Sequence, residues 1–442
     1  MLHAPALTHR TLFMSDSLLL EAAAIPGTLP EWFRNAQSQA AARFDSLPMP
    51  SRRDEFWRFS NLKALDPQDF TPARPVADEV AQELVAQSAG VAAAAGTFVF
   101  ANDHLISRTN SSALAAQGVL WMPISKALEN HADLVEKYFM RSEPALGSSK
   151  HLALHLASVR AGTFLYVPKG VHIEAPLQTF HWLAGSGQAV FPHTLIVAEE
   201  CSSVTVVDWF KSTGDARNMA CGVNDLHVGP NAKVHYISVQ DWSRQTVSLN
   251  SNVTEVAQGA SALHLGLHLG GVFSRSESVS RLNGAGARCE MLAATVADHA
   301  QEFDQRTLQE HVSPDTYSDL LYKNALYDQS KTIVSGLIRV EPEAHRTDAY
   351  QKVRNLILSP DAEANSLPGL EILADQVKCS HGATTGEIDA EELFYMQARG
   401  ISARDAYRLI TYGFLNEVLE RLPEATLRET LQSALRNRLQ GH

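Results

Sequence analysis

The spacing of apolar residues divides the chain into three zones. Up to about residue 92, apolar side chains recur with helical spacing, for example in 31–44 and 77–88. From roughly 95 to 378 they alternate with polar residues in short runs bounded by Gly, Asn, Asp and Pro. Helical spacing returns near residue 387. Since a helix repeats every 3.6 residues and a strand every two, the pattern predicts a β-rich core between helical ends.

Strict alternation is the strongest signal in the central zone. In 263–269 every second residue is leucine, and His, Gly and His stand between them. This order predicts a half-buried strand, with one face in the core and one in solvent. Similar runs predict strands over 97–101, 163–167, 194–198, 203–207, 234–239, 290–296 and 332–340.

The central zone also restricts the fold class. Long helical stretches are hard to find between about 190 and 340. A parallel sheet of the βαβ kind needs a helix in each crossover, so a sandwich, a barrel or a solenoid remains. Strands recur at short, similar intervals for over two hundred residues, which favours a mainly β fold with a parallel β-helix core. The expected units are a helical region 1–94, a core 95–386 and a helical domain 387–442.

Helix start and stop signals mark the C-terminal zone. Asp389 and Glu392 have the spacing of a capping box, and Gly400 suits a left-handed C-cap. Ser402 begins the next helix, which Pro423 ends. A last helix, beginning near Thr426, carries leucines in register.

Composition and charge exclude several classes of protein. The 442 residues include 37 Lys and Arg against 49 Asp and Glu, a formal net charge of −12. Non-specific nucleic-acid binding needs clustered positive charge, so we expect no nucleic-acid partner. The apolar runs are far shorter than the ~20 residues that span a bilayer, and the chain begins without the order of a secretion signal. We therefore expect a cytoplasmic protein without a membrane partner; Met14 is an alternative start to Met1.

Cys379 and His381 are the strongest candidate metal ligands. On a strand, residues two apart face the same side, with about 7 Å between their Cα atoms. Thiolate sulfur and imidazole nitrogen are good ligands for iron or zinc. Gly382 is expected to permit a turn, which would leave the pair at a strand end. The competing interpretation is a buried structural cysteine and a histidine that bonds to backbone.

The number of donors limits what this pair can hold. An iron–sulfur cluster takes about four protein ligands, and the segment around Cys379 and His381 offers two. Such a chain can hold a cluster transiently if a partner supplies the other ligands. If metal is involved, this favours an assembly scaffold over an electron carrier.

Other clusters of polar residues are weaker candidates. Two histidine pairs, His264 with His268 and His151 with His155, fit structural roles better than metal binding. An acidic stretch is either catalytic, as in a β-helix that acts on polysaccharides, or forms solenoid corners; its members are Asp304, His311, Asp315 and Asp319. Walker and serine-nucleophile patterns are absent, so we expect no intrinsic ATPase activity.

Four stretches resemble the SufB/SufD family of the SUF iron–sulfur cluster assembly scaffold. The fourth, Cys379-Ser380-His381-Gly382-Ala383-Thr384, is the most specific. Two departures from the family pattern, Ser335 and the His345-Arg346 pair, do not touch the proposed ligand. The segments that carry the resemblance are 161–171 with 174–178, 311–326, 336–340 with 347–351 and 355–358, and 379–384 with 393–396, 399–401 and 413–414.

The resemblance implies both an architecture and a role. The architecture is a right-handed parallel β-helix between helical ends. The role is that of a non-catalytic scaffold subunit that pairs with SufB and the SufC ATPase, with SufC docking on the helices of 389–440. His381 matches the family histidine proposed as a ligand where SufB and SufD meet, and Cys379 matches its neighbour. The resemblance further implies an iron–sulfur cluster or iron that is held transiently and shared with SufB, and no permanently bound cofactor. Whether the chain alone forms a homodimer stays open.

Two other classes remain as alternatives. One is a β-helix enzyme acting on polysaccharides, which is expected to carry a secretion signal and an acidic cluster on one sheet face. The other is a purely structural solenoid that only holds SufB and SufC together. Reconstitution with iron, with and without His381 and Cys379, separates this second alternative from a metal-binding scaffold.

Overall fold

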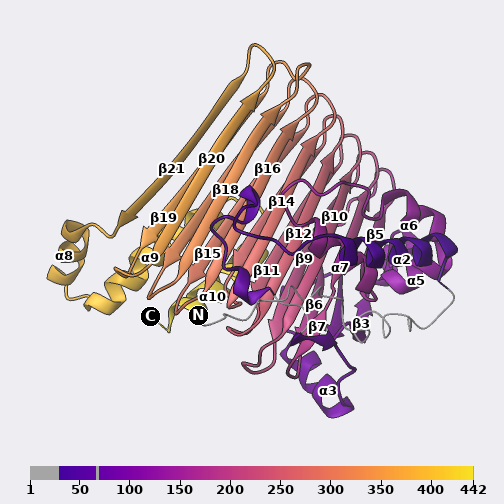
Figure 1. Cartoon of the computed structure of the whole chain (residues 1–442), viewed down its shortest axis with the longest axis horizontal. Helices are drawn as coiled ribbons and strands as arrows, with labels where there is room; N and C mark the ends of the chain where they lie inside the picture. The colour runs from indigo at the N-terminus through magenta and orange to yellow at the C-terminus, as the bar shows by residue number, and fades with distance from the viewer. Residues whose placement is uncertain (1–28, 66–68, 442) are drawn as a thin grey trace, which may run out of the picture.

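The computed structural model describes residues 29–65 and 69–441, and its body is a rod of two parallel sheets (Figure 1). The alternative starts, Met1 and Met14, lie outside these residues. The first sheet has 11 strands and the second has 10, and from residue 193 onward consecutive strands of the chain alternate between the sheets. This arrangement confirms the predicted mainly β fold and its parallel β-helix core.

Successive coils of the rod stack strand upon strand with parallel pairing. Val247 pairs with Phe273, 26 positions later, whereas Lys331 pairs with Glu363, 32 positions later. The coils therefore differ in length, which explains why the sequence shows no strict repeat. The first sheet contains β4 Leu120–Pro123, β5 Gly162–Val167, β8 His193–Ala198, β10 Met219–Val228, β12 Val247–Val256, β14 Phe273–Leu282, β16 Glu302–His311, β18 Lys331–Val340 and β20 Glu363–Ile372, with β1 Thr71–Pro72 and β7 Gln188–Val190 alongside.

The second sheet lies opposite the first, and the two enclose an apolar core. Tyr236, Met291 and Leu320 of the second sheet pack in one cluster with Leu226 and Leu282 of the first. The predicted strands are all present. This sheet contains β2 Gly96–Ala101, β3 His104–Asn110, β6 Leu177–Leu183, β9 Ser203–Ser212, β11 Lys233–Asp241, β13 Ser261–His268, β15 Arg288–Ala297, β17 Tyr317–Leu326, β19 Asp348–Ile357 and β21 Lys378–Glu387.

The N-terminal end of the rod is closed by antiparallel strands and helices. β3 pairs antiparallel with β2, and β4 pairs antiparallel with β5, so the stack of parallel coils stops there. Short helices within 112–158, which the sequence pattern did not predict, surround this end (Figure 1). The helices and short 3₁₀ turns before the first coils of the rod are α2 Glu31–Ser46, η2 Glu55–Trp57, η3 Leu62–Ala64, α3 Asp78–Gln87, α4 Ser112–Ala116, α5 Ile124–Asn130, α6 Ala132–Tyr138 and α7 Ser149–Ser158.

Three C-terminal helices follow the last strand: α8 Ala390–Ala398, α9 Ala403–Leu419 and α10 Ala425–Leu439. Their predicted caps are confirmed, since the Asp389 side chain accepts from the Glu391 amide and the Ser402 side chain from the Asp405 amide. Leucines of α9 and α10 pack with those of β13 in one buried cluster. The expected half-buried strand at 263–269 is therefore wrong in one respect, because the helices cover its outer face.

The opposite end of the rod is formed by the edge strands of the two sheets. In the part of the chain that the structure describes, β20 and β21 are the last strands of their sheets, and each pairs with one neighbour. Large apolar side chains are exposed here, among them Leu367, Leu370 and Ile372. The helices within residues 29–65 and 69–441 are all too short or too polar to span a lipid bilayer.

Candidate functional site

The last coil carries both predicted metal-ligand residues. Cys379 and His381 lie two apart on β21, so they share one face of the strand, as expected. Cys379 packs against Ile338, Val340 and Ala349, which places this face toward the interior of the rod. His381 is exposed because no further coil is stacked on β21 within the described residues.

The preceding coil forms the floor beneath the pair. Cys379 pairs with Ala349 and His381 with Gln351, both of which are buried. A Cβ atom on Gly336 of β18 would lie 1.7 Å from the Gln351 side-chain nitrogen. Gly336 therefore leaves the space in which Gln351 reaches across the interior under His381.

The Cys379 thiol is half-buried, and its surroundings disfavour the thiolate. Burial raises its pKa above the usual value, and the negative charge of Asp348 raises it further. The free thiol is therefore protonated at neutral pH. A metal ion would have to displace this proton before sulfur could bind it. This makes Cys379 a conditional donor rather than a permanently charged one.

The expected turn at Gly382 is wrong. β21 continues through Gly382, which pairs with Lys352, and ends at Glu387. No atom lies within 4 Å of a Cβ added at Gly382, so packing does not require a glycine at this position. Cys379 and His381 consequently lie near the beginning of a ten-residue edge strand. Helix α8 follows this strand after two residues.

The acidic stretch of the sequence does not form a shared site. Asp304 is buried on β16, whereas Asp315 is exposed in a turn and paired with Arg346. Asp319 lies on β17, in the other sheet, and accepts from Arg421. Only Asp315 occupies a solenoid corner. The described residues contain no group of three or more His, Cys, Asp or Glu side chains placed to hold a metal ion.

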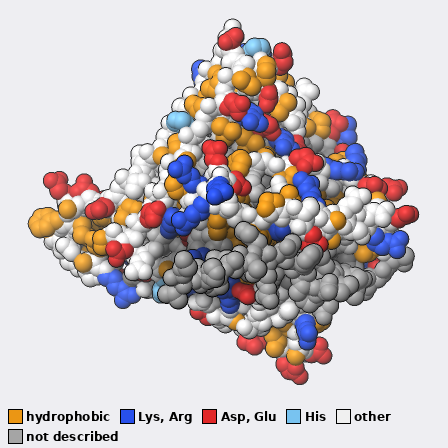
Figure 2. All heavy atoms as spheres, viewed as in Figure 1, with side chains coloured by type: hydrophobic (Ala, Val, Ile, Leu, Met, Phe, Trp, Pro, Cys, Tyr) orange, Lys and Arg blue, Asp and Glu red, His pale blue; other side chains and the backbone are white. Residues whose placement is uncertain are grey.

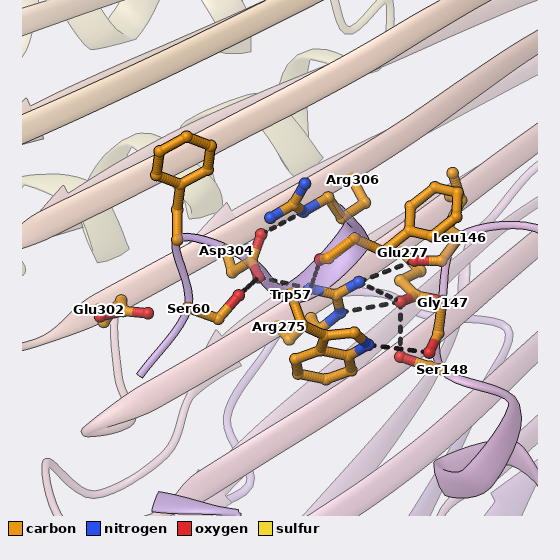
Figure 3. Close-up of polar contacts among 12 residues, drawn as sticks. Trp57, Ser60, Leu146, Gly147, Ser148, Arg275, Glu277, Glu302, Asp304 and Arg306 are labelled. Carbon is orange, nitrogen blue, oxygen red and sulfur yellow. Dashed lines mark hydrogen bonds and ion pairs between the residues drawn. The ribbon is translucent and has the colours of Figure 1, made fainter. Parts of the chain in front are cut away.

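Asp304 belongs instead to a buried ionic cluster that the sequence did not reveal (Figure 3). Arg275 lies between Glu277 and Asp304, at 2.8 and 2.5 Å. Arg306 donates to Asp304 from the other side, at 2.6 Å. The Arg275 guanidinium also lies 3.7 Å from the ring centroid of Trp57. The cluster fixes the N-terminal segment against the outer face of the first sheet.

The histidine pairs have structural contacts, as expected. On α7, His155 bonds the Cys221 carbonyl at 2.8 Å and the ring of His193 at 3.1 Å. His264 and His268 line the interior of the rod on β13, and burial lowers the pKa of both, to about 3 and about 4. All four cysteines of the sequence are free thiols. None of these groups completes a metal site with Cys379 and His381.

Comparison with known proteins identifies the family. The family model described as "SUF system FeS cluster assembly, SufBD core domain" matches residues 181–414, and the "SufBD protein N-terminal region" matches 16–179. The chain is 30% identical over 420 residues to the iron–sulfur cluster assembly protein SufD of Bacillus subtilis, covering 93% of this chain and 94% of that protein.

Two staphylococcal proteins extend the comparison. The chain is 26% identical over 409 residues to iron–sulfur cluster assembly SufBD family proteins of Staphylococcus saprophyticus and Staphylococcus aureus, covering 89% of this chain and 86% of each relative. Together the two family models span both the helical N-terminal part and most of the rod. The chain therefore belongs to the SufBD family of the SUF iron–sulfur cluster assembly system.

Proposed function

We propose that this chain is a non-catalytic scaffold subunit that assembles iron–sulfur clusters together with SufB and the SufC ATPase. The cluster, or the iron that forms it, is the cargo of the complex rather than a resident cofactor. His381 and Cys379 supply two of its ligands, and SufB supplies the others.

The observation that carries this proposal is the position of His381. Its side chain is exposed on the last coil of the rod, beside a half-buried thiol and next to apolar side chains that are also exposed. Two donors do not complete a cluster site, which takes about four. A second subunit that covers this end would place its own donors against the pair and exclude water from the ligands.

The C-terminal helices offer a separate docking surface for SufC. Phe394 and Tyr395 of α8 are 71% and 57% exposed. Figure 2 shows hydrophobic side chains at the projecting tip that this helix forms on the left. Large exposed aromatic residues are typical of protein interfaces. Because α8 follows β21 directly, a movement of SufC would reach the strand that carries His381.

Replacement of His381 tests the ligand role. We expect His381→Ala to lower the iron and sulfide content of the reconstituted complex by about tenfold or more, because an imidazole ligand is lost. Ser380→Ala is the matched control, since Ser380 is exposed on the same strand but faces the other side. Cluster content is measured by iron and sulfide analysis and by visible absorption.

Complex formation is measured on the same samples by size-exclusion chromatography. Both variants should bind SufB and SufC as the unaltered chain does. Full cluster yield with His381→Ala contradicts the ligand role and leaves a purely structural solenoid. Failure of the unaltered chain to bind SufB contradicts the proposed function itself.

A further inference from the structure

Two edge strands, β20 and β21, end the sheets at this end of the rod, and the backbone of β20 limits how a partner strand can pair with it. The amides of Glu363 and Leu373 donate toward β18, so the even-numbered residues of β20 direct their backbone groups to the open edge. Pro368 is one of these residues and has no amide hydrogen. The open edge of β20 is therefore interrupted at its centre, and side chains must contribute much of any recognition there.

A row of alternating charges crosses the outer face of the first sheet and ends at this edge. Glu255, Arg281, Glu310, Arg339 and Glu371 occupy one register on five successive strands, β12 to β20. Arg281 contacts Glu255 at 3.2 Å and Glu310 at 2.6 Å. Arg339 lies 3.9 Å from Glu310 and donates to Glu371 at 2.9 Å. In Figure 2, which views this face, acidic and basic side chains are interspersed.

A second row runs parallel to the first at the other end of the strands. Glu302, Lys331 and Glu363 share a register on β16, β18 and β20. The Lys331 ammonium lies 3.4 Å from the Glu363 carboxylate. Both rows alternate in sign, and both end on β20 with a glutamate. By repeat of the pattern, the next strand would carry a cation at each position.

The terminal glutamates are incompletely matched. Glu310, in the middle of its row, lies between two arginines, and its side chain is 14% exposed. Glu371 has one arginine neighbour and is 44% exposed, and Glu363 is 59% exposed. Opposite charges directly across paired strands stabilise the pairing, and like charges oppose it.

We propose that the open edge of β20 selects a partner strand that carries Lys or Arg at two positions, one opposite Glu363 and one opposite Glu371. The two glutamates are eight residues apart, so the partner's cations lie about 27 Å apart along the strand. This proposal rests on the proposed function, which places the partner subunit at this end of the rod. It adds the charge pattern by which that subunit is recognised.

The same pattern disfavours a second copy of this chain at this edge. In an antiparallel pairing centred on Leu367, Glu363 would face Glu371 of the second copy. This pairing opposes carboxylates at both positions, so the pattern favours a different subunit over self-association.

Charge reversal at both positions tests the proposal. We expect the double variant Glu363→Lys/Glu371→Lys to bind the partner subunit SufB about tenfold more weakly, with a weaker dependence of affinity on salt. A milder variant, Glu363→Gln/Glu371→Gln, should lose less affinity. Glu79→Lys/Glu143→Lys, at two exposed positions away from this edge, changes the net charge equally and should bind normally. Affinity is measured by isothermal titration calorimetry, and folding by circular dichroism.

Self-association separates this proposal from the proposed function. An equimolar mixture of the unaltered chain and the Lys double variant should associate more tightly in sedimentation velocity than either protein alone. Equal binding of SufB by the Lys variant and the unaltered chain overturns the charge pattern, as does an equal loss with the control variant. If the unaltered chain does not bind SufB, the proposed function fails. The mixture still tests the charge pattern in that case, and a mixture that associates no more tightly than either protein alone overturns it.

Discussion

Single buried charges decide how the N-terminal segment is held on the rod. The Arg275 side chain is 1% exposed, and its guanidinium donates to two carboxylates and to the backbone carbonyls of Phe56 and Leu146. Since every donor group on the guanidinium has a partner, the desolvation cost is largely offset. The cluster ties η2 and the loop before α7 to β14 and β16.

Removal of this cation is expected to be costly. Arg275→Met leaves Glu277 buried without a counterion and Asp304 with Arg306 alone, so we expect the free energy of unfolding to fall by about 3–5 kcal/mol. Arg346→Met is the matched control, because the Arg346 pair with Asp315 is exposed and should leave the urea midpoint unchanged. Urea unfolding followed by circular dichroism measures both. A small effect at Arg275 would mean that water enters the cluster.

Residue-level prediction from sequence succeeded where chemistry and local spacing were sufficient. Cys379 and His381 share a face, as alternation on a strand required. The Arg275 cluster could not be predicted, because a charged residue facing outward from a strand normally meets solvent. Whether Trp57 covers it depends on contacts between residues more than two hundred positions apart. The sequence around Arg275 does not indicate which distant segment of the chain covers it.

At the scale of elements, α9 and α10 are parts of the core rather than appendages. Leu415 and Val418 of α9 pack with Leu265 and Leu267 of β13. Removal of all residues after Asp389 would expose this apolar face, so such a truncation tests stability and docking together. Substitutions on α8 avoid this, because none of the residues of α8 is buried.

We therefore expect Phe394→Ala/Tyr395→Ala to weaken SufC binding without a change in stability. Two exposed aromatic side chains at an interface each contribute ~1–2 kcal/mol, so the double variant should lose about thirtyfold or more in affinity. Val80→Ala/Val85→Ala on α3 is the matched control, since both valines are exposed on a helix far along the chain. Binding is measured by surface plasmon resonance. Normal affinity would exclude the tip of α8 from the interface.

Strands were easier to predict from sequence than short helices. Each strand of the rod spans up to ten residues and displays several periods of alternation. Helices α4, α5 and α6 have five to seven residues, so they span two turns or fewer and show too little of the 3.6-residue period. The covering of β13 was missed for a different reason: the leucines that pack on its outer face lie on α9 and α10, which are far from β13 in the sequence.

For the whole molecule, buried titratable groups predict sensitivity to acid. Burial lowers the pKa of six histidines to between about 3 and about 4, and it also lowers that of His193 well below the usual value. Below pH 6.5 these histidines are protonated in the unfolded chain but stay neutral in the folded chain, so the free energy of unfolding falls as the pH is lowered. Four carboxyls with pKa values raised to about 6–7 act in the opposite sense; they are Asp103, Asp208, Asp225 and Glu302.

The seven histidines outnumber these four carboxyls by three, so the free energy of unfolding should fall by about 4 kcal/mol for each pH unit by which the pH is lowered near pH 5. His181→Phe tests one contributor, since this ring stacks between Phe100 and Phe210 and its nitrogens lack a hydrogen-bond partner among the described residues. Relative to the unaltered chain, the variant should gain about 2 kcal/mol between pH 7 and pH 5. Urea unfolding at both pH values gives this difference, and an equal offset at both would contradict it.

The unequal ends of the rod bear on how it grows during synthesis. The sealed end is made of residues that leave the ribosome early, and each later coil can add to a template that is already ordered. The open edge of the sheets therefore moves along the rod as the chain is synthesised, and each new coil pairs with the coil made just before it. Because the helices that shield β13 follow all the strands of the rod in the chain, its leucines stay uncovered until after the whole rod has been synthesised, which is the interval in which a chaperone would act.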